Sequence, residues 1–209
     1  MTRVLVADDH PVVREGVRHV LQGAVEMEVV GEVGRADEVL PAVRRLTPDV
    51  VILDIGMPGP SFLEVLAALP EAHPGAHALI LSAHSEEEYA VRAFRGGATG
   101  YLTKGYASAE LLDAVRRVAQ GRRYVSASLA EQLAMGLAGD AEPKPHERLS
   151  NREFEVLRLL ALGRSLKEIA AELDVSPKTV SSFRARILEK LRARTNADLI
   201  RYALEHSLI

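Results

Sequence analysis

Side chains that can bind a metal ion or a phosphoryl group follow four short apolar runs in the first half of the chain. They are Asp8, Asp9, Asp54, Ser82, Thr103 and Lys104. Crowded carboxylates repel one another unless a cation neutralises them, and hard oxygen ligands suit Mg²⁺. The three aspartates therefore predict a divalent metal site if the runs end at one place. The alternative, a helix cap at Asp8 and Asp9 and an unrelated loop residue at Asp54, explains each acid singly but not their common position.

The elements that must hold these side chains alternate between buried strands and amphipathic helices. Apolar runs typical of buried parallel strands occur near residues 4–6, 29–30, 50–53, 79–81 and 100–102. A helical spacing of apolar residues follows each run, and the fifth such helix stops at Gly121. This order predicts a doubly wound α/β domain with a five-stranded parallel sheet over residues 1–121. In such sheets ligands bind beyond the carboxyl ends of the strands.

The composition favours two folded domains in a reducing compartment. The chain has 209 residues, 47% of them hydrophobic, and no cysteine, which excludes disulfides and thiolate zinc sites. We expect a cytoplasmic protein with no role for a membrane, since neither an export signal nor a spanning apolar run is recognisable. Residues 146–209 hold 12 Lys and Arg against 9 Asp and Glu, although the whole chain has a net charge of −3. A basic C-terminal part that follows an acidic N-terminal part favours a nucleic-acid partner.

The second half of the chain is predicted to be helical. Residues 122–145 have the composition of a linker and contain a weak helix, with Leu129, Leu133 and Leu137 on one face. Residues 146–209 show three helix starts: a capping box at Ser150 and Glu153, a helix over 166–173, and an N-cap serine before proline at Ser176-Pro177. The short turn between the second and third of these helices is typical of a helix-turn-helix. In the third helix the predicted buried stripe is Val180, Phe183, Ile187 and Leu191.

The opposite face of this third helix carries small polar side chains flanked by arginines. Small side chains let a helix enter a major groove, while arginines on its flanks can reach phosphates. Between Ser176 and Arg194 six basic residues stand against one acid, so the local field is positive. A solvated helix in a small bundle is the alternative. The candidate DNA-binding residues are Lys178, Thr179, Ser181, Ser182, Arg184, Ala185 and Arg186.

The first domain resembles the receiver domains of two-component response regulators, whose sheet is flavodoxin-like. The resemblance is carried by Asp8-Asp9, by the segment Asp54-Ile55-Gly56-Met57-Pro58-Gly59, by Ser82-Ala83 and by Lys104. It implies that Asp54 accepts a phosphoryl group from a sensor histidine kinase and that Lys104 contacts the phosphoryl oxygens. It also implies a switch formed by Ser82 and Tyr101. The implied Mg²⁺ ligands are Asp8, Asp9, Asp54 and the backbone carbonyl of Gly56.

The second domain resembles the LuxR-type helix-turn-helix of the NarL/FixJ regulators. Residues 149–153, 167–170, 175–180 and 187–191 carry this resemblance. It implies binding to double-stranded DNA, control of transcription and homodimers on two half-sites. The last helix, predicted over 197–208, is a candidate dimer interface, although a core face within one monomer fits its pattern equally well.

Several residues depart from these family patterns. Phe62 stands where receivers usually have glycine, and because a bulky residue avoids positive φ we expect the loop before the third helix to differ. Gly105 replaces a common proline after Lys104, so that peptide bond is less disposed to be cis. His84 and Gly56 occupy positions that tune loss of the phosphoryl group in the family. Phe183 stands where the relatives often carry His or Tyr, and Ser181 stands where they often carry Lys. These two departures leave fewer charges facing the groove.

Two other classes of function remain open from the sequence. A Mg²⁺-dependent phosphohydrolase would use Asp54 as a nucleophile against external substrates, but the chain has no evident substrate-capping insertion. A DNA-binding protein whose receiver serves only as an interaction module would need no phosphorylation. We expect a regulator rather than an enzyme, with self-phosphorylation and dephosphorylation confined to Asp54.

Overall fold

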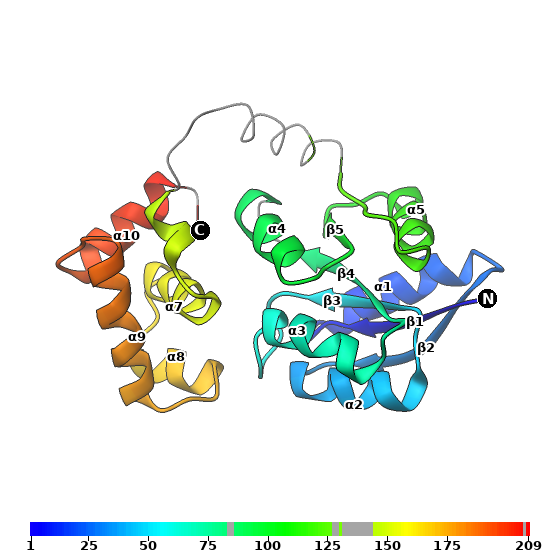
Figure 1. Ribbon diagram of the computed structural model, residues 1–209, viewed down its shortest axis with the longest axis horizontal. Helices are drawn as coiled ribbons and strands as arrows, with labels where there is room; N and C mark the ends of the chain where they lie inside the picture. The colour runs from blue at the N-terminus through cyan, green and yellow to red at the C-terminus, as the bar shows by residue number, and fades with distance from the viewer. Residues whose placement is uncertain (83–85, 127–129, 131–143, 207) are drawn as a thin grey trace. The chain divides into compact units, whose positions relative to one another are not determined.

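The computed structural model describes residues 1–82, 86–126, 130, 144–206 and 208–209. The chain forms two compact units, Met1–Met135 and Gly136–Ile209. The first unit is a sheet covered by helices, and the second is a group of helices (Figure 1). The predicted weak helix with Leu129, Leu133 and Leu137 lies outside the described residues, so the linker over 122–145 and the boundaries at 121 and 146 stay predictions. Across the described residues, no helix is both long enough and apolar enough to span a bilayer.

The first unit alternates five strands with five helices, as predicted. All the strand pairs are parallel, in the order β2-β1-β3-β4-β5, which confirms the doubly wound fold class. The strands are β1 (Thr2–Ala7), β2 (Met27–Val33), β3 (Val50–Asp54), β4 (His77–Ser82) and β5 (Gly100–Thr103). The helices are α1 (Pro11–Gln22), α2 (Ala36–Leu46), α3 (Phe62–Ala72), α4 (Glu86–Arg95) and α5 (Ser108–Ala119).

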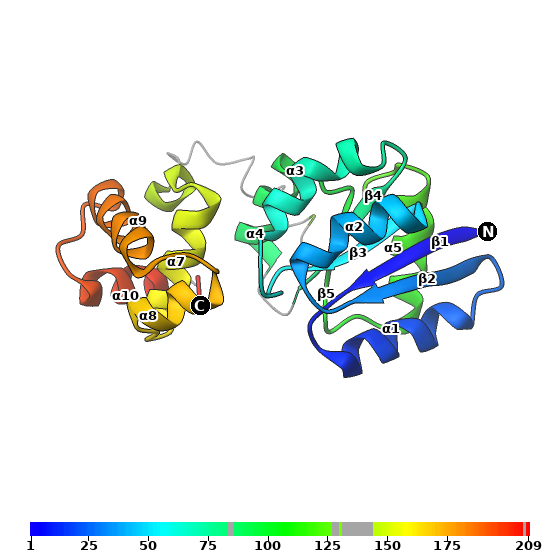
Figure 2. The same cartoon turned by 90° about the horizontal axis from the view of Figure 1, so that it is seen from below.

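Helices cover both faces of this sheet. Helices α1 and α5 lie on one face, and α2, α3 and α4 lie on the other (Figure 2). Every residue of the central strand β3 is therefore buried, whereas the edge strand β2 is largely half-exposed. The parallel register places Asp54 beside Leu81 and Ser82 beside Thr103, so the polar strand ends meet at one edge of the sheet.

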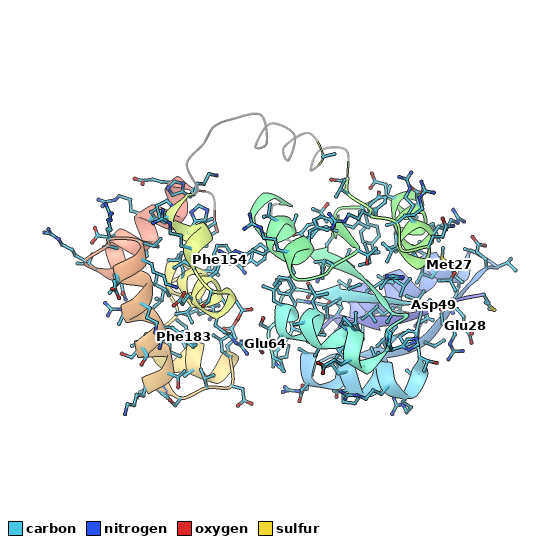
Figure 3. All side chains as sticks on the ribbon, in the orientation of Figure 1. Met27, Glu28, Asp49, Glu64, Phe154 and Phe183 are labelled. Carbon is cyan, nitrogen blue, oxygen red and sulfur yellow. The ribbon has the colours of Figure 1, made fainter. Side chains whose placement is uncertain are left out.

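The loop that enters α3 does not require positive φ at Phe62. Ser61 caps the helix by accepting a hydrogen bond from the Leu63 amide, and Glu64, labelled in Figure 3, accepts one from the Ser61 amide. Phe62 is the first helical residue and is 2% exposed, with its ring 6.2 Å from that of Tyr89. The residue with positive φ is Gly59, at +112°. The left-handed residue of this loop therefore lies three residues before Phe62, and that the loop differs from the loop of related receivers stays a prediction.

Packing of the first unit continues beyond α5. Gly121 takes a left-handed φ of +69°, and the chain then turns back along β5. The Tyr101 amide donates to the Tyr124 carbonyl at 3.0 Å, and the Tyr124 amide donates to the Thr99 carbonyl at 3.1 Å. The Tyr124 ring is buried in the core, so this residue covers the outer edge of β5.

The second unit is helical throughout its described residues. Ser150 and Ser176 cap their helices as predicted, and Pro177 is the first residue of α9. Phe154 on α7 is buried, but Phe183 on α9 is only half-buried (Figure 3). The other three residues of the predicted stripe, Val180, Ile187 and Leu191, are buried. The elements are a 3₁₀ turn η1 (Pro145–Arg148), α7 (Asn151–Ala161), α8 (Leu166–Glu172), α9 (Pro177–Lys190) and α10 (Asn196–Glu205).

Candidate functional site

Two buried aspartates and a lysine meet at the carboxyl edge of the sheet. Asp8 follows β1, Asp54 ends β3 and Lys104 follows β5. The Lys104 Nζ lies 2.8 Å from Oδ2 of Asp8 and 3.0 Å from Oδ2 of Asp54. The fold thus brings three of the predicted site residues into direct contact, although up to 96 residues separate them in the chain.

The charges in this pocket are not balanced by protein groups alone. Burial raises the pKa of the Asp54 carboxyl, and repulsion from Asp8 raises it further against the opposing effect of Lys104. Burial would lower the pKa of Lys104, but its hydrogen bonds to Asp8 and Asp54 outweigh this effect and the pKa is raised. The lysine is therefore held in its charged form, while the carboxylates still carry excess negative charge.

The acidic residues lie close enough together to hold a metal ion. One ligand atom from each of Asp8, Asp9, His10 and Asp54 lies within 4.8 Å of the other three. The buried Oδ1 of Asp9 lies 2.7 Å from Nδ1 of His10. A cluster this rich in carboxylate oxygens fits a hard divalent cation.

The predicted switch residues lie beside this pocket. Ser82 and Tyr101 are both 0% exposed. The Lys104 amide donates to the Ser82 carbonyl at 2.7 Å, which ties the ends of β4 and β5 together. Among the described residues there is no cis peptide bond, in agreement with the expectation for Lys104-Gly105. His84 lies outside the described residues.

Arg14 on α1 contacts the backbone of Asp8 and the side chain of Glu32. Its guanidinium donates to the Asp8 carbonyl at 2.6 Å, and its Nε lies 3.4 Å from Oε2 of Glu32. The arginine thereby links the ends of β1 and β2. The sequence reasoning missed this residue, although its place on the first turns of the helix after Asp8 was an available signal.

The candidate DNA-binding residues occupy one side of α9. Lys178, Ser181, Ser182, Ala185 and Arg186 are exposed, and Thr179 and Arg184 are half-exposed. Two hydroxyls are already engaged: Thr179 Oγ1 lies 2.8 Å from Ser176 Oγ, and Ser182 donates to the Lys178 carbonyl at 3.1 Å. The Arg184 Nε donates to Oδ1 of Asn196 at the start of α10, which restrains its guanidinium.

A buried ion pair fixes α9 against the start of α7. Glu153 is 2% exposed, and its Oε2 accepts a hydrogen bond from Lys190 Nζ at 2.6 Å. The same oxygen accepts from the Ser150 amide at 2.7 Å. The capping box was predicted, but the ion pair was not, because the partners are 37 residues apart.

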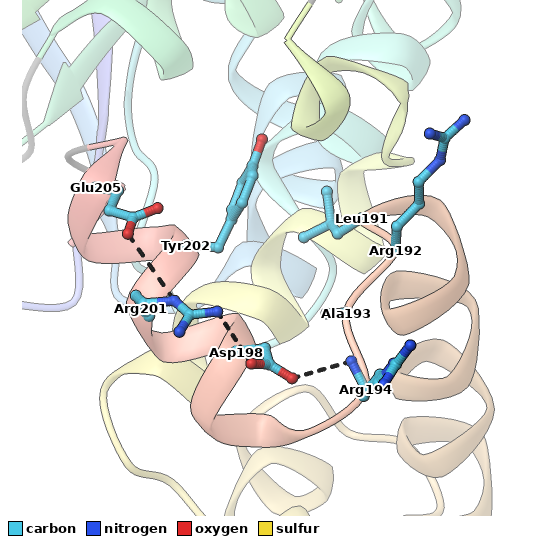
Figure 4. Close-up of a pocket in the computed structure, with 8 residues that line it drawn as sticks. All are labelled: Leu191, Arg192, Ala193, Arg194, Asp198, Arg201, Tyr202 and Glu205. Carbon is cyan, nitrogen blue, oxygen red and sulfur yellow. Dashed lines mark hydrogen bonds and ion pairs between the residues drawn. The ribbon is translucent and has the colours of Figure 1, made fainter.

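A second concave region lies where the α9–α10 turn meets α10 (Figure 4). Its lining includes three arginines and two carboxylates, and of the arginine side chains only that of Arg201 is drawn paired with the carboxylates. Arg201 contacts Asp198 at 3.1 Å and Glu205 at 3.9 Å, and the Arg194 amide donates to Asp198 at 3.1 Å. The two carboxylates of this region are thus already engaged by Arg201 and by the Arg194 amide, and we assign the region no chemistry.

Comparison with known families supports both units. Residues 4–116 match the response regulator receiver domain, and residues 147–203 match the bacterial regulatory proteins of the luxR family. The response regulator GacA of Pseudomonas viridiflava is 36% identical over 210 aligned residues, which cover 100% of this chain and 98% of GacA. The chain is a two-component response regulator of the LuxR family.

Further relatives of this response regulator agree. The response regulator UvrY of Escherichia coli K12 is 33% identical and is aligned over 100% of this chain and 96% of its own length. RcsB of Salmonella enterica serovar Typhimurium, solved bound to promoter rprA in the presence of the phosphomimetic BeF₃⁻, has a TM-score of 0.71 and 28% identity over 97% of this chain and 98% of its own. The response regulator ChrA of a heme-sensing two-component system has a TM-score of 0.54 and 33% identity over 99% of this chain and 98% of its own.

Proposed function

We propose that Asp54 of this response regulator accepts a phosphoryl group from a sensor histidine kinase. The observation that carries the proposal is the contact of Lys104 with both Asp8 and Asp54 at the carboxyl edge of the sheet. One Asp54 oxygen would bond to phosphorus as the bond from phosphorus to the kinase histidine nitrogen breaks, with the electron pair left on nitrogen. Phosphoryl transfer needs alignment and charge stabilisation above all, and this pocket provides both.

Of the other pocket residues, some would bind the metal ion and the phosphoryl group, and one would orient a metal ligand. Asp8, Asp9, Asp54 and the Gly56 carbonyl would hold Mg²⁺, which when bound supplies the positive charge that offsets their repulsion and attracts phosphoryl oxygens. Lys104, held protonated by its two carboxylate partners, would pair with a phosphoryl oxygen. Arg14 would keep Asp8 in place through the Asp8 carbonyl.

The switch would begin at Ser82 and end at Tyr101. A phosphoryl group on Asp54 adds acceptor oxygens, and the Ser82 hydroxyl would move to donate a hydrogen bond to one of them. Ser82 ends the strand that pairs with β5, so its movement would change the space around the Tyr101 ring. The reorganised surface would then favour a homodimer.

Double-stranded DNA would be read by α9. Its exposed Lys178, Ser181, Ser182, Ala185 and Arg186 would face the major groove, with Thr179 and Arg184 at its borders. RcsB, at 28% identity, was solved with promoter DNA, which supports this assignment. In α10, Leu199 and Ala203 are buried in the monomer core, whereas Leu204 is 61% exposed. Leu204 rather than the whole helix face would therefore contribute to the dimer.

The deciding experiment is incubation with a small acyl-phosphate donor and Mg²⁺, followed by intact mass measurement. Wild type and an Asp37→Asn control should each gain one phosphoryl group, and Asp54→Asn should gain none. Phosphate incorporated into Asp54→Asn would contradict the assignment of the acceptor. Steady release of phosphate from generic esters by the wild type would instead favour a phosphohydrolase.

A further inference from the structure

Residues 122–126, which we call the exit segment, run along the outer edge of β5 after α5 has ended. The Tyr124 amide donates to the Thr99 carbonyl at 3.1 Å, and the Tyr124 carbonyl accepts from the Tyr101 amide at 3.0 Å. These two bonds make a parallel bridge between Gly100 and Tyr124. The exit segment thus extends the edge of the sheet by one bridge, and from there the chain continues toward the second unit.

Side-chain packing also holds Tyr124 against β5 and α5. Tyr124 is 8% exposed, and its side chain lies in the core of the first unit. A Cβ added at Gly100 would lie 3.3 Å from the Cβ of Tyr124 and 2.7 Å from the side chain of Val118, so this close approach needs glycine. The Arg117 guanidinium on α5 lies 5.8 Å from the centre of the Tyr124 ring. The position of Tyr124 therefore depends on both elements.

Arg123 joins the exit segment to α4. Its guanidinium lies 5.7 Å from the centre of the Phe94 ring, within the range of a cation–π interaction. Helix α4 is the element that follows Ser82 in the chain, and it packs against β5. The exit segment therefore contacts three elements, β5, α4 and α5, and a change in their relative positions would alter at least one of these contacts.

The residue of β5 whose amide pairs with the exit segment is Tyr101, the switch residue of the proposed function. The side chains of Tyr101 and Ser82 are completely buried. A ring that is packed inside the fold restrains the backbone that carries it, and the Tyr101 backbone supplies the hydrogen bond to Tyr124. The buried ring and the paired exit segment occur together in this structure, so one state of the switch contains both.

We propose that a phosphoryl group on Asp54 stabilises the pairing of the exit segment with β5 and so carries the signal to the chain that leads into the DNA-binding unit. The inference rests on the proposed function, since it needs the switch at Ser82 and Tyr101. Firm pairing fixes the point from which the chain leaves the receiver. Coupling between two sites is reciprocal, so the contacts of the exit segment must also strengthen the binding of a phosphoryl mimic at Asp54.

The first test measures amide hydrogen exchange in the full-length protein with Mg²⁺, in the presence and absence of BeF₃⁻ as the phosphoryl mimic. We expect BeF₃⁻ to slow exchange of the Tyr124 amide by about tenfold or more in the wild type and to have no effect in Asp54→Asn. The Thr47 amide, which donates to the Val43 carbonyl at the end of α2, is the control for overall stabilisation and should change less than about twofold. Unchanged or faster exchange at Tyr124 in wild type that has bound BeF₃⁻, or equal slowing at Thr47, would overturn the proposal.

The second test uses the reciprocal effect, measured as the affinity for BeF₃⁻ by calorimetry with Mg²⁺ present. Arg123→Gln removes the contact with Phe94, and Arg122→Gln changes the neighbouring exposed arginine. We expect Arg123→Gln to weaken BeF₃⁻ binding by about two- to fivefold, whereas Arg122→Gln should match the wild type. Equal affinity of Arg123→Gln and the wild type would overturn the proposal. Failure of the wild type to bind BeF₃⁻, or equally tight binding by Asp54→Asn, would instead refute the proposed function at Asp54.

Discussion

The ammonium of Lys104 lies 3.0 Å from Oδ2 of Asp54, and this one cation also serves Asp8 at 2.8 Å. Both carboxylates are almost completely buried. Two buried anions share a single positive partner, so the pocket is short of positive charge before a metal ion or a phosphoryl group arrives.

Removal of the Asp54 charge is expected to stabilise the metal-free protein. Because burial and Asp8 raise the pKa of Asp54, ionisation is less favourable in the folded state than in the unfolded state. The resulting destabilisation is absent below the unfolded-state pKa, develops as pH rises from there to the raised folded-state pKa, and is fully present above it. Asp54→Asn should therefore raise the midpoint of thermal unfolding at neutral pH by about 2–4 °C in chelator. Added Mg²⁺ should reduce the difference by stabilising the wild type, and a lower midpoint for the variant in chelator would contradict this view.

Removal of the Lys104 charge should have the opposite effect. Lys104→Met leaves Asp8 and Asp54 without their shared cation, and an uncompensated buried charge costs about 2–4 kcal/mol. We expect this loss in urea unfolding with chelator present, with part of it recovered on addition of Mg²⁺. Lys167→Met, at an exposed position on α8, is the matched control and should lie within about 0.5 kcal/mol of the wild type. Equal stability of the two variants would mean that the pocket does not need the lysine.

The ion pair between Lys190 and Glu153 should make the helical unit sensitive to acid. Burial alone would raise the pKa of Glu153, but hydrogen bonds from Lys190 and Ser150 outweigh it and lower the pKa. A lowered pKa adds stability that is present above the unfolded-state pKa and is lost as pH falls through the folded-state pKa.

Lys190→Met should therefore cost about 1–2 kcal/mol at neutral pH, less than for a fully buried pair because Lys190 is 37% exposed. Part of the acid sensitivity should disappear with it. A double-mutant cycle with Glu153→Gln measures the coupling, and additive effects of the two changes would show that the contact contributes nothing to stability.

Arg192 follows the C-cap of α9 and has a left-handed φ of +52°. Glycine adopts this conformation at little steric cost, whereas other residues pay about 1 kcal/mol or more. Arg192→Gly should therefore raise the free energy of unfolding by about 0.5–1 kcal/mol. Arg194→Gly, at a neighbouring position without positive φ, should not. Destabilisation by both changes would mean that the contacts of the Arg192 side chain stabilise the fold by more than its left-handed backbone destabilises it.

Arg184 and Ser182 should affect DNA binding in different ways. We propose that Arg184, which donates to Asn196, contacts a phosphate, so Arg184→Gln should weaken binding to many sequences alike. It should also flatten the dependence of log affinity on log salt by about one unit. Ser182→Ala should change the preference among sequences and leave the salt dependence unaltered. Titrations by fluorescence anisotropy at several salt concentrations distinguish these outcomes, and the reverse pattern would exchange the two roles.

Local sequence patterns predicted much of this protein because they act over short distances. The apolar runs around Val50 and Leu79 specify buried strands. Ser150 and Ser176 mark helix starts because each side chain accepts a hydrogen bond from an amide three residues later. The parallel fold then places the residues that follow the strands at one edge, so Asp8, Asp54 and Lys104 could be grouped before any coordinates were known.

Contacts between residues distant in sequence were decided only by the tertiary structure. That the left-handed residue of the loop before α3 is Gly59 and not Phe62 depends on the path of the folded backbone. The bond between Lys190 and Glu153 and the support of Asp8 by Arg14 depend on how helices pack, which local spacing does not specify. His10 illustrates the division most clearly. Its position after two aspartates is plain in the sequence, but the 2.7 Å approach of its ring to Asp9 depends on backbone and side-chain angles that only the folded chain fixes.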